Sequence, residues 1–184
     1  MERQKIINSL KEDTQSIVET VRSNFLALDR EKLRQRPLPN QWSIGECIAH
    51  LNIADAHYIR QFDRKLKDVN PSPESVEFKP GRLGNYFVKM IKPLEDGTIP
   101  SPMKTLKKFV PEIDNDENTL HQFLSDQQVI LDTLERSRVL NLNKIKITSA
   151  IGPIVTFKLG DAFRFLIGHN QRHIIQASRV LERI

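Results

Sequence analysis

Two of the five histidines in the chain, His169 and His173, stand four residues apart in the stretch GHNQRHIIQ. In a helix this spacing places both imidazoles on one face, a single turn apart, where they can bind one metal ion together. Zinc peptidases use the same spacing in the motif H-E-x-x-H, whose glutamate acts as general base. Here Asn170 follows the first histidine instead. The pair therefore indicates a metal site and argues against a peptidase of that type, and a third ligand is needed.

The cysteine count restricts what that third ligand can be. Cys47 is the only cysteine of the chain, which excludes an internal disulfide and a thiolate zinc cluster. Its position one helical turn before His50 would allow it to approach a metal, but we interpret it as a small buried apolar side chain. A metal in this protein is therefore expected to use nitrogen and oxygen ligands.

A third imidazole comes from a helix predicted over residues 43–66. Ser43 and Glu46 form the S-x-x-E pattern of a capping box, and apolar residues recur behind them at helical spacing. His50 lies two turns into this helix, at the edge of its apolar face, where it can point into a core. If this helix neighbours the one that carries His169 and His173, the three imidazoles converge.

Apolar periodicity predicts long amphipathic helices, separated by segments of different character. The predicted helices cover about residues 3–29, 43–66, 116–138 and 159–183. Segment 67–115 holds seven of the ten prolines and is predicted to be a long irregular insertion between the second and third helices. These four helices predict an all-α fold, a four-helix bundle that forms a single domain over residues 1–184.

Two shorter elements are predicted between the long helices. Within the insertion, LGNYFVKMIK is apolar and basic enough for a short helix, which we expect to pack on the protein rather than on a membrane. The stretch LNLNKIKITSAIGPIVTF alternates apolar and polar residues around a Gly-Pro pair, which predicts an extended link or a short hairpin.

Composition and charge narrow the classes of partner. Charged residues make up 28% and hydrophobic residues 39% of the chain, which is typical of a soluble globular protein. The net charge of +5 is spread over mixed acidic and basic residues, so we expect no nucleic-acid partner. The first residues lack the apolar core of a signal peptide and no segment is long enough to span a membrane, so the expected location is the cytoplasm.

Taken together, the segments QWSIGECIAHLNIAD and GPIVTFKLGDAFRFLIGHNQRHIIQ resemble those of the DinB/YfiT-like family. The resemblance extends over nearly the whole chain and departs most in the insertion at 67–115. It implies a four-helix bundle in which His50, His169 and His173 bind a divalent transition metal. Imidazole ligands suit zinc, nickel or iron alike, so the ligand type does not identify the metal. Members of the family are often dimers, which implies a possible homodimer here.

Three histidine ligands leave at least one position of the metal open to water or substrate, as in catalytic sites. The resemblance implies two activities for such a site. One is metal-dependent hydrolysis, and the other, which we favour, is transfer of a low-molecular-weight thiol to an electrophilic small molecule. An interpretation from another class is a non-catalytic metal-binding or stress-associated bundle.

Four further polar residues, on the predicted helices, are candidates for the site or for the solvated surface. His57 lies two turns after His50 and is a candidate acid or base at the rim of the pocket, with a surface histidine as the alternative. Gln176 is a candidate hydrogen-bond partner within the site, with a bridge between two helices as the alternative. For Arg172 we expect an ion pair between helices or an exposed charge, with contact to an anionic ligand as a further alternative. His121 is expected to be solvated.

Overall fold

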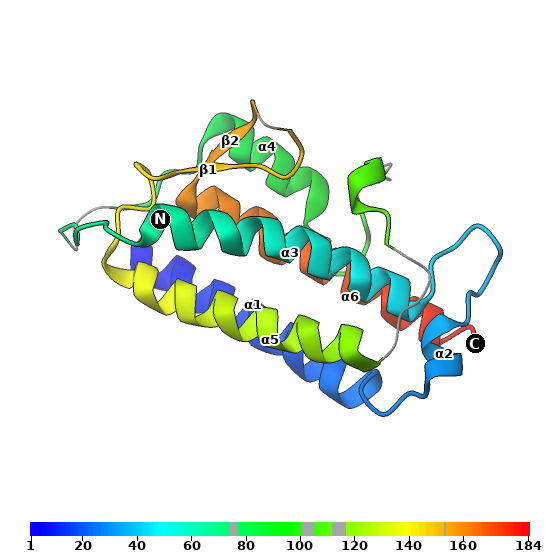
Figure 1. Cartoon of the computed structure of the whole chain (residues 1–184). Coiled ribbons are helices and arrows are strands. Elements are labelled where there is room, and N and C mark those ends of the chain that lie inside the picture. Colours follow the sequence, from blue (N-terminus) through cyan, green and yellow to red (C-terminus); the bar gives the residue numbers. More distant parts are fainter. Residues whose placement is uncertain (74–76, 101–104, 112–116, 153) are drawn as a thin grey trace.

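A computed structural model describes residues 1–73, 77–100, 105–111, 117–152 and 154–184 of the chain. The fold is an all-α bundle, as the sequence predicted (Figure 1). Its long helices are α1 (Arg3–Asn24), α3 (Ile44–Leu66), α5 (Glu117–Arg136) and α6 (Leu159–Leu181). Each of these helices packs against two others, because α1 contacts α5 and α6, and α3 contacts the same two. The neighbouring position of α3 and α6 is the one that the predicted metal ligands require.

The first helix ends earlier than predicted. Helix α1 stops at Asn24 rather than near residue 29, and a short helix α2 (Arg30–Arg34) follows. Asp29 caps α2, since its side chain accepts a hydrogen bond of 2.8 Å from the backbone N–H of Lys32. Phe25 and Leu33 are both buried in the common core. Apolar spacing therefore continues across the break, and it does not reveal where the helix ends.

The start of α3 has the predicted capping box. The Ser43 hydroxyl accepts from the backbone N–H of Glu46 at 3.2 Å, and the Glu46 carboxylate accepts from the backbone N–H of Ser43 at 2.9 Å. The same carboxylate accepts a hydrogen bond of 2.8 Å from Nε of Arg36. These contacts tie the loop before α3 to the helix, and thereby fix the position of Trp42, the residue that precedes the cap.

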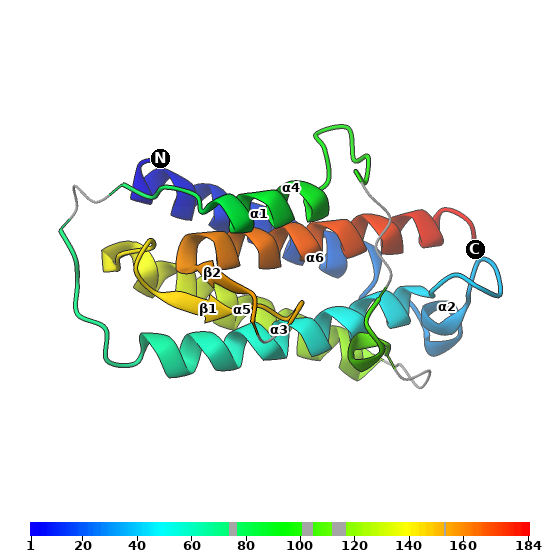
Figure 2. The ribbon, with the colours of Figure 1, turned by 90° about the horizontal axis from the view of Figure 1, so that it is seen from above.

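The segment between α3 and α5 contains the predicted short helix, α4 (Arg82–Ile91). Helix α4 lies along α6, against which it buries Val88 and Ile91 (Figure 2). A 3-10 turn, η1 (Lys107–Phe109), contacts α3 and buries Phe109. The middle segment therefore covers two of the bundle helices with short pieces of structure.

The predicted link between α5 and α6 is a short antiparallel hairpin. A 3-10 turn, η2 (Ser137–Val139), follows α5, and the strands are β1 (Lys146–Thr148) and β2 (Thr156–Lys158). Ile147 pairs with Phe157 in the centre of this hairpin, and both side chains are buried. Among the described residues, no helix has the length and apolar character that crossing a bilayer requires.

A polar cluster interrupts the core where α3, α5 and α6 meet. Oδ2 of Asp55 accepts hydrogen bonds from Gln127 Nε2 at 2.7 Å and from Asn170 Nδ2 at 3.1 Å. All three side chains are completely buried. Burial, together with the nearby charge of Asp126, raises the pKa of Asp55 to about 8. The Asp55 carboxyl is therefore mostly protonated at neutral pH.

Candidate metal centre

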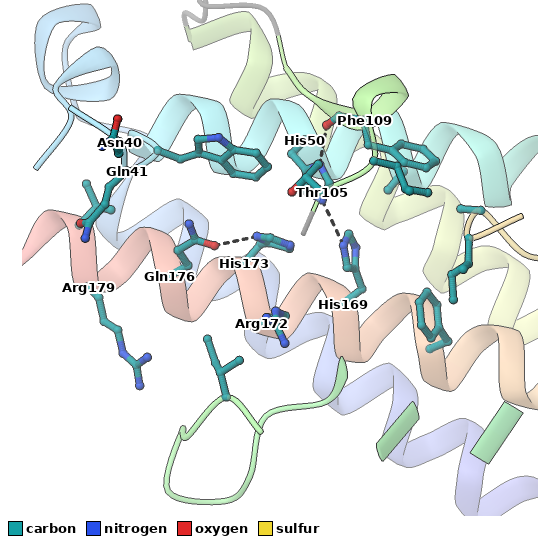
Figure 3. Close-up of a pocket in the computed structure, with 18 of the residues that line it drawn as sticks. Asn40, Gln41, His50, Thr105, Phe109, His169, Arg172, His173, Gln176 and Arg179 are labelled. Atoms are coloured by element: carbon teal, nitrogen blue, oxygen red, sulfur yellow. Dashed lines mark hydrogen bonds between the residues drawn. The ribbon is translucent and has the colours of Figure 1, made fainter. Parts of the chain in front are cut away.

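The three predicted ligands meet between α3 and α6. His50 comes from α3, and His169 and His173 come from successive turns of α6 (Figure 3). One ring nitrogen from each histidine lies within 4.8 Å of the other two, and the Nε2 atoms of His50 and His169 are 3.2 Å apart. Two ligands of a tetrahedral zinc, each about 2.0–2.1 Å from the ion, are separated by about 3.3 Å. The cluster is therefore compatible with metal binding after a small closure.

Hydrogen bonds on the far side of two rings favour the orientation that a metal needs. Nδ1 of His50 donates to the backbone carbonyl of Phe109 at 2.7 Å, and Nδ1 of His173 donates to Oε1 of Gln176 at 3.0 Å. A neutral imidazole that donates from Nδ1 has its lone pair on Nε2. Both residues therefore present an unprotonated Nε2 to the cluster, in the arrangement typical of metal-ligating histidines.

The environment keeps the three imidazoles neutral. Burial lowers the pKa of His50, and it lowers the pKa of His173 to about 3, with further contributions from His50 and Arg172. The pKa of His169 also falls well below its ordinary value, first because of burial and then because of the charges of His173, His50 and Arg172. A metal therefore does not have to compete with protons for these ligands near neutral pH.

The cluster leaves room for a ligand beside a metal. Among the described His, Cys, Asp and Glu residues, no fourth side chain joins the three histidines. A cavity of about 520 Å³ opens next to them. Trp42 forms one wall, with its ring centroid 5.0 Å from that of His50 and 5.9 Å from that of His173, and Phe109 forms another. The donor set thus fits a metal with an open position and an adjoining pocket that has aromatic walls.

His57 is placed apart from the three-histidine cluster. Its Nε2 donates to the backbone carbonyl of Thr148 at 3.0 Å, which ties α3 to strand β1. His57 does not belong to the described residues that line the cavity, whereas the next residue, Tyr58, does. The acid–base role of His57 stays a prediction, and the contact observed is a structural one. His121 is exposed on α5, as expected.

Arg172 differs from the sequence expectation of an ion pair or an exposed charge. Its side chain is buried, with 7% of its surface exposed, and it lines the cavity. Within the described part of the chain it forms no ion pair, and its Nη1 atom has no hydrogen-bond partner. The place of Arg172 in the sequence, between His169 and His173, did not reveal this burial. The face of α6 that lines the cavity is wider than the two histidines alone indicate, and it includes Arg172.

Gln176 contacts a predicted ligand, and its removal is expected to weaken metal binding. Without the acceptor on Nδ1, His173 loses the hydrogen bond that orients it, so Gln176→Ala should raise the Kd for zinc by about tenfold. Competition with a fluorescent chelator would measure this change. Gln176→Glu keeps an acceptor oxygen and should retain wild-type affinity or exceed it. Equal Kd values for wild type and Gln176→Ala would show that the contact does not support the site.

Cys47 is expected to be unreactive in the folded protein. Its thiol is completely buried, and burial raises its pKa, so little thiolate is available. A thiol reagent such as iodoacetamide should label Cys47 in denaturant and leave the native protein unmodified over the same period, which intact mass spectrometry would measure. Rapid labelling of the native protein would show that the helix opens there.

Comparison with known proteins gives one family match. No curated protein and no solved structure gives a significant match to the chain. A family model described as the DinB superfamily matches residues 17–177, a range that contains His50, His169 and His173. The match covers most of the chain and all of its bundle except the first part of α1 and the end of α6. The chain therefore belongs to the DinB superfamily.

Proposed function

We propose that this protein is a metal-dependent enzyme that transfers a low-molecular-weight thiol to an electrophilic small molecule. The observation that carries the proposal is the position of the three-histidine cluster at an open cavity of about 520 Å³. A closed structural site would have four protein ligands and no adjoining space. A cavity of this size holds a small organic molecule, and its aromatic walls can contact the apolar part of an electrophile.

The side chains at the cavity support thiol transfer over hydrolysis. The described lining residues include no Asp or Glu, the residue type that commonly serves as general base in metal-dependent hydrolases. They also include no Cys, Ser or Lys. Cys47 is buried away from the cavity, and burial raises the pKa of Tyr58 to about 12, so that its hydroxyl stays protonated. A nucleophile that arrives with the cosubstrate fits this site.

The proposed reaction forms a C–S bond and breaks two bonds, the S–H bond of the thiol and the bond from carbon to the leaving group. The thiol loses its proton to solvent, the sulfur lone pair forms a C–S bond, and the leaving group departs with the electron pair of its bond to carbon. A divalent ion held by the three imidazoles supplies Lewis acidity, which favours the thiolate over the thiol at neutral pH. Trp42 and Phe109 exclude water from one side of the pocket, and their faces are available to orient a planar electrophile.

A transfer assay on metal-loaded protein tests the proposal. Protein loaded with zinc, nickel or iron is mixed with L-cysteine and monochlorobimane, and the thioether is measured by its fluorescence and mass. We expect a rate at least tenfold above that of His169→Ala, which lacks a ligand, while His121→Ala on the exposed face of α5 keeps the full rate.

Hydrolysis is measured in parallel with an activated ester. The metal-loaded protein could cleave the ester and form no thioether with any of a panel of thiols. This result would contradict thiol transfer and indicate that the protein is a hydrolase. Tight metal binding without either reaction would leave a non-catalytic metal-binding bundle.

A further inference from the structure

The cavity beside the three histidines is lined by positive charge. Arg172, Arg179 and Arg183 all contribute to its lining, and the described lining residues contain no acidic side chain. Arg179 and Arg183 are exposed, and Arg179 donates to the backbone carbonyl of Gly97 at 3.0 Å. Arg172 alone is buried. The positive charge therefore extends from the exposed rim of the cavity to its interior.

The burial of Arg172 has no compensation from the described protein. A guanidinium stays protonated in proteins, and removal of such a charge from water is costly unless an anion pairs with it. The side chain is 7% exposed, forms no ion pair in the described residues, and has a buried Nη1 without a hydrogen-bond partner. Figure 3 shows Arg172 between His169 and His173 along α6, among the residues that line the pocket.

The ligand set adds to this charge instead of cancelling it. Three neutral imidazoles carry no negative charge, so a divalent ion bound to them keeps its charge of about +2, in contrast to a site with a carboxylate ligand. Together with Arg172, the interior of the loaded cavity would be strongly positive. A thiolate contributes one negative charge, which alone does not balance it, whereas a ligand set with a second negative group comes closer.

We propose that Arg172 binds a carboxylate, and that one of the two small molecules held beside the histidines carries that group. The planar guanidinium presents parallel N–H donors that match the two oxygens of a carboxylate. The carboxylate belongs either to the thiol or to the electrophile. This inference rests on the proposed function for the identity of these molecules, but the binding of a carboxylate does not require that the reaction occurs.

Paired probes that differ only in charge test the proposal by isothermal titration calorimetry. The thiol pair is 3-mercaptopropionate and 3-mercaptopropionamide. The second pair, butyrate and butyramide, imitates an electrophile without its leaving group and cannot react. In the metal-free and in the zinc-loaded protein, we expect the carboxylate of at least one pair to bind roughly tenfold tighter than its amide, because a charged hydrogen bond is lost in the amide. The pair that shows the preference identifies which molecule carries the group.

Variants assign the preference to Arg172. Arg172→Met should abolish it, and Arg172→Lys should restore part of it, which distinguishes lost binding from lost structure. Arg60→Met removes an exposed charge of α3 outside the cavity and should keep the full preference. Equal binding of carboxylate and amide by the wild type, no measurable binding of either carboxylate, or an undiminished preference in Arg172→Met would overturn the proposal.

The two proposals fail separately. Metal-free protein could prefer the carboxylate while the protein neither binds a metal nor forms a thioether. This result would support the carboxylate site at Arg172 and contradict the proposed thiol transfer. Conversely, the zinc-loaded protein could transfer the thiol and show no preference for either carboxylate. This result would support the proposed activity and contradict the carboxylate site at Arg172. The Trp42 fluorescence gives an independent readout, because Trp42 is the only tryptophan and lies in the cavity wall.

Discussion

Zinc at about a thousand times its Kd should raise the free energy of unfolding by about 4 kcal/mol, provided that zinc binds the folded chain and not the unfolded one. The reason is that His50 and the His169–His173 pair come from helices far apart in the sequence, so the complete ligand set exists only in the folded bundle. Urea denaturation in the presence and absence of zinc would measure the difference.

Variants at the cluster separate this effect from unspecific stabilisation. His169→Ala should lose nearly all of the zinc-dependent stabilisation, because two imidazoles remain and the affinity falls by orders of magnitude. His57→Ala should keep it, since His57 contacts Thr148 and lies outside the cluster. Equal stabilisation of wild type and His169→Ala would mean that zinc binds elsewhere on the chain.

Titration of Asp55 should lower the free energy of unfolding of the metal-free protein by about 2 kcal/mol between pH 6.5 and pH 8.5, measured as the change in the difference between wild type and Asp55→Asn. The pKa of Asp55 is raised from 3.8 to about 8 in the folded protein. Between these values the folded state holds a proton that the unfolded state has released, so stability decreases as pH rises. Above pH 8 the buried carboxyl ionises, and the decrease levels off.

The histidines of the cluster act in the opposite direction, but over a lower pH range. Their folded pKa values lie below 6.5, so the unfolded state takes up protons first, and stability falls as pH drops below 6.5. Between pH 6.5 and about pH 7.5 this contribution still increases with pH, because the unfolded histidines are half protonated at pH 6.5. Comparison of wild type with Asp55→Asn cancels the histidine contribution and isolates the carboxyl.

Asp55→Asn is the decisive variant, because an amide imitates the protonated carboxyl. It can accept the hydrogen bonds from Gln127 and Asn170 and cannot ionise. Urea denaturation across the pH range should show an advantage of Asp55→Asn over wild type that grows with pH, while Asp63→Asn on the exposed face of α3 follows wild type. Identical slopes for Asp55→Asn and wild type would show that the carboxyl ionises freely in the fold.

The long helices and the ligand set were predictable because each depends on local patterns. Apolar spacing over a long segment defines a helix whatever its neighbours are, and the capping box at Ser43 and Glu46 fixes where α3 begins. The meeting of His50 with the pair on α6 needed only that α3 and α6 be neighbours. The family resemblance supplied that step, and the fold confirms it.

Features that depend on tertiary packing could not be read from the same patterns. The partner of His50 Nδ1 is a backbone carbonyl, that of Phe109, and backbone atoms carry no sequence signal. The buried cluster of Asp55, Gln127 and Asn170 joins three helices, and each residue alone is typical of a helix surface. The burial of Arg172 likewise depends on the elements that pack around α6. Whether a polar residue on a helix is buried, and which partner it contacts, therefore depends on the packing of the whole bundle.

Metal content is the most direct test of the central claim, that His50, His169 and His173 form a divalent metal site. Protein without an affinity tag, purified without chelator, would be analysed by plasma mass spectrometry beside His50→Ala and His169→Ala, with His121→Ala as the matched control. We predict about one transition-metal ion per chain in wild type and control, and almost none in the two ligand variants. Wild-type protein that holds no metal, even after incubation with zinc, nickel and iron, would contradict the claim.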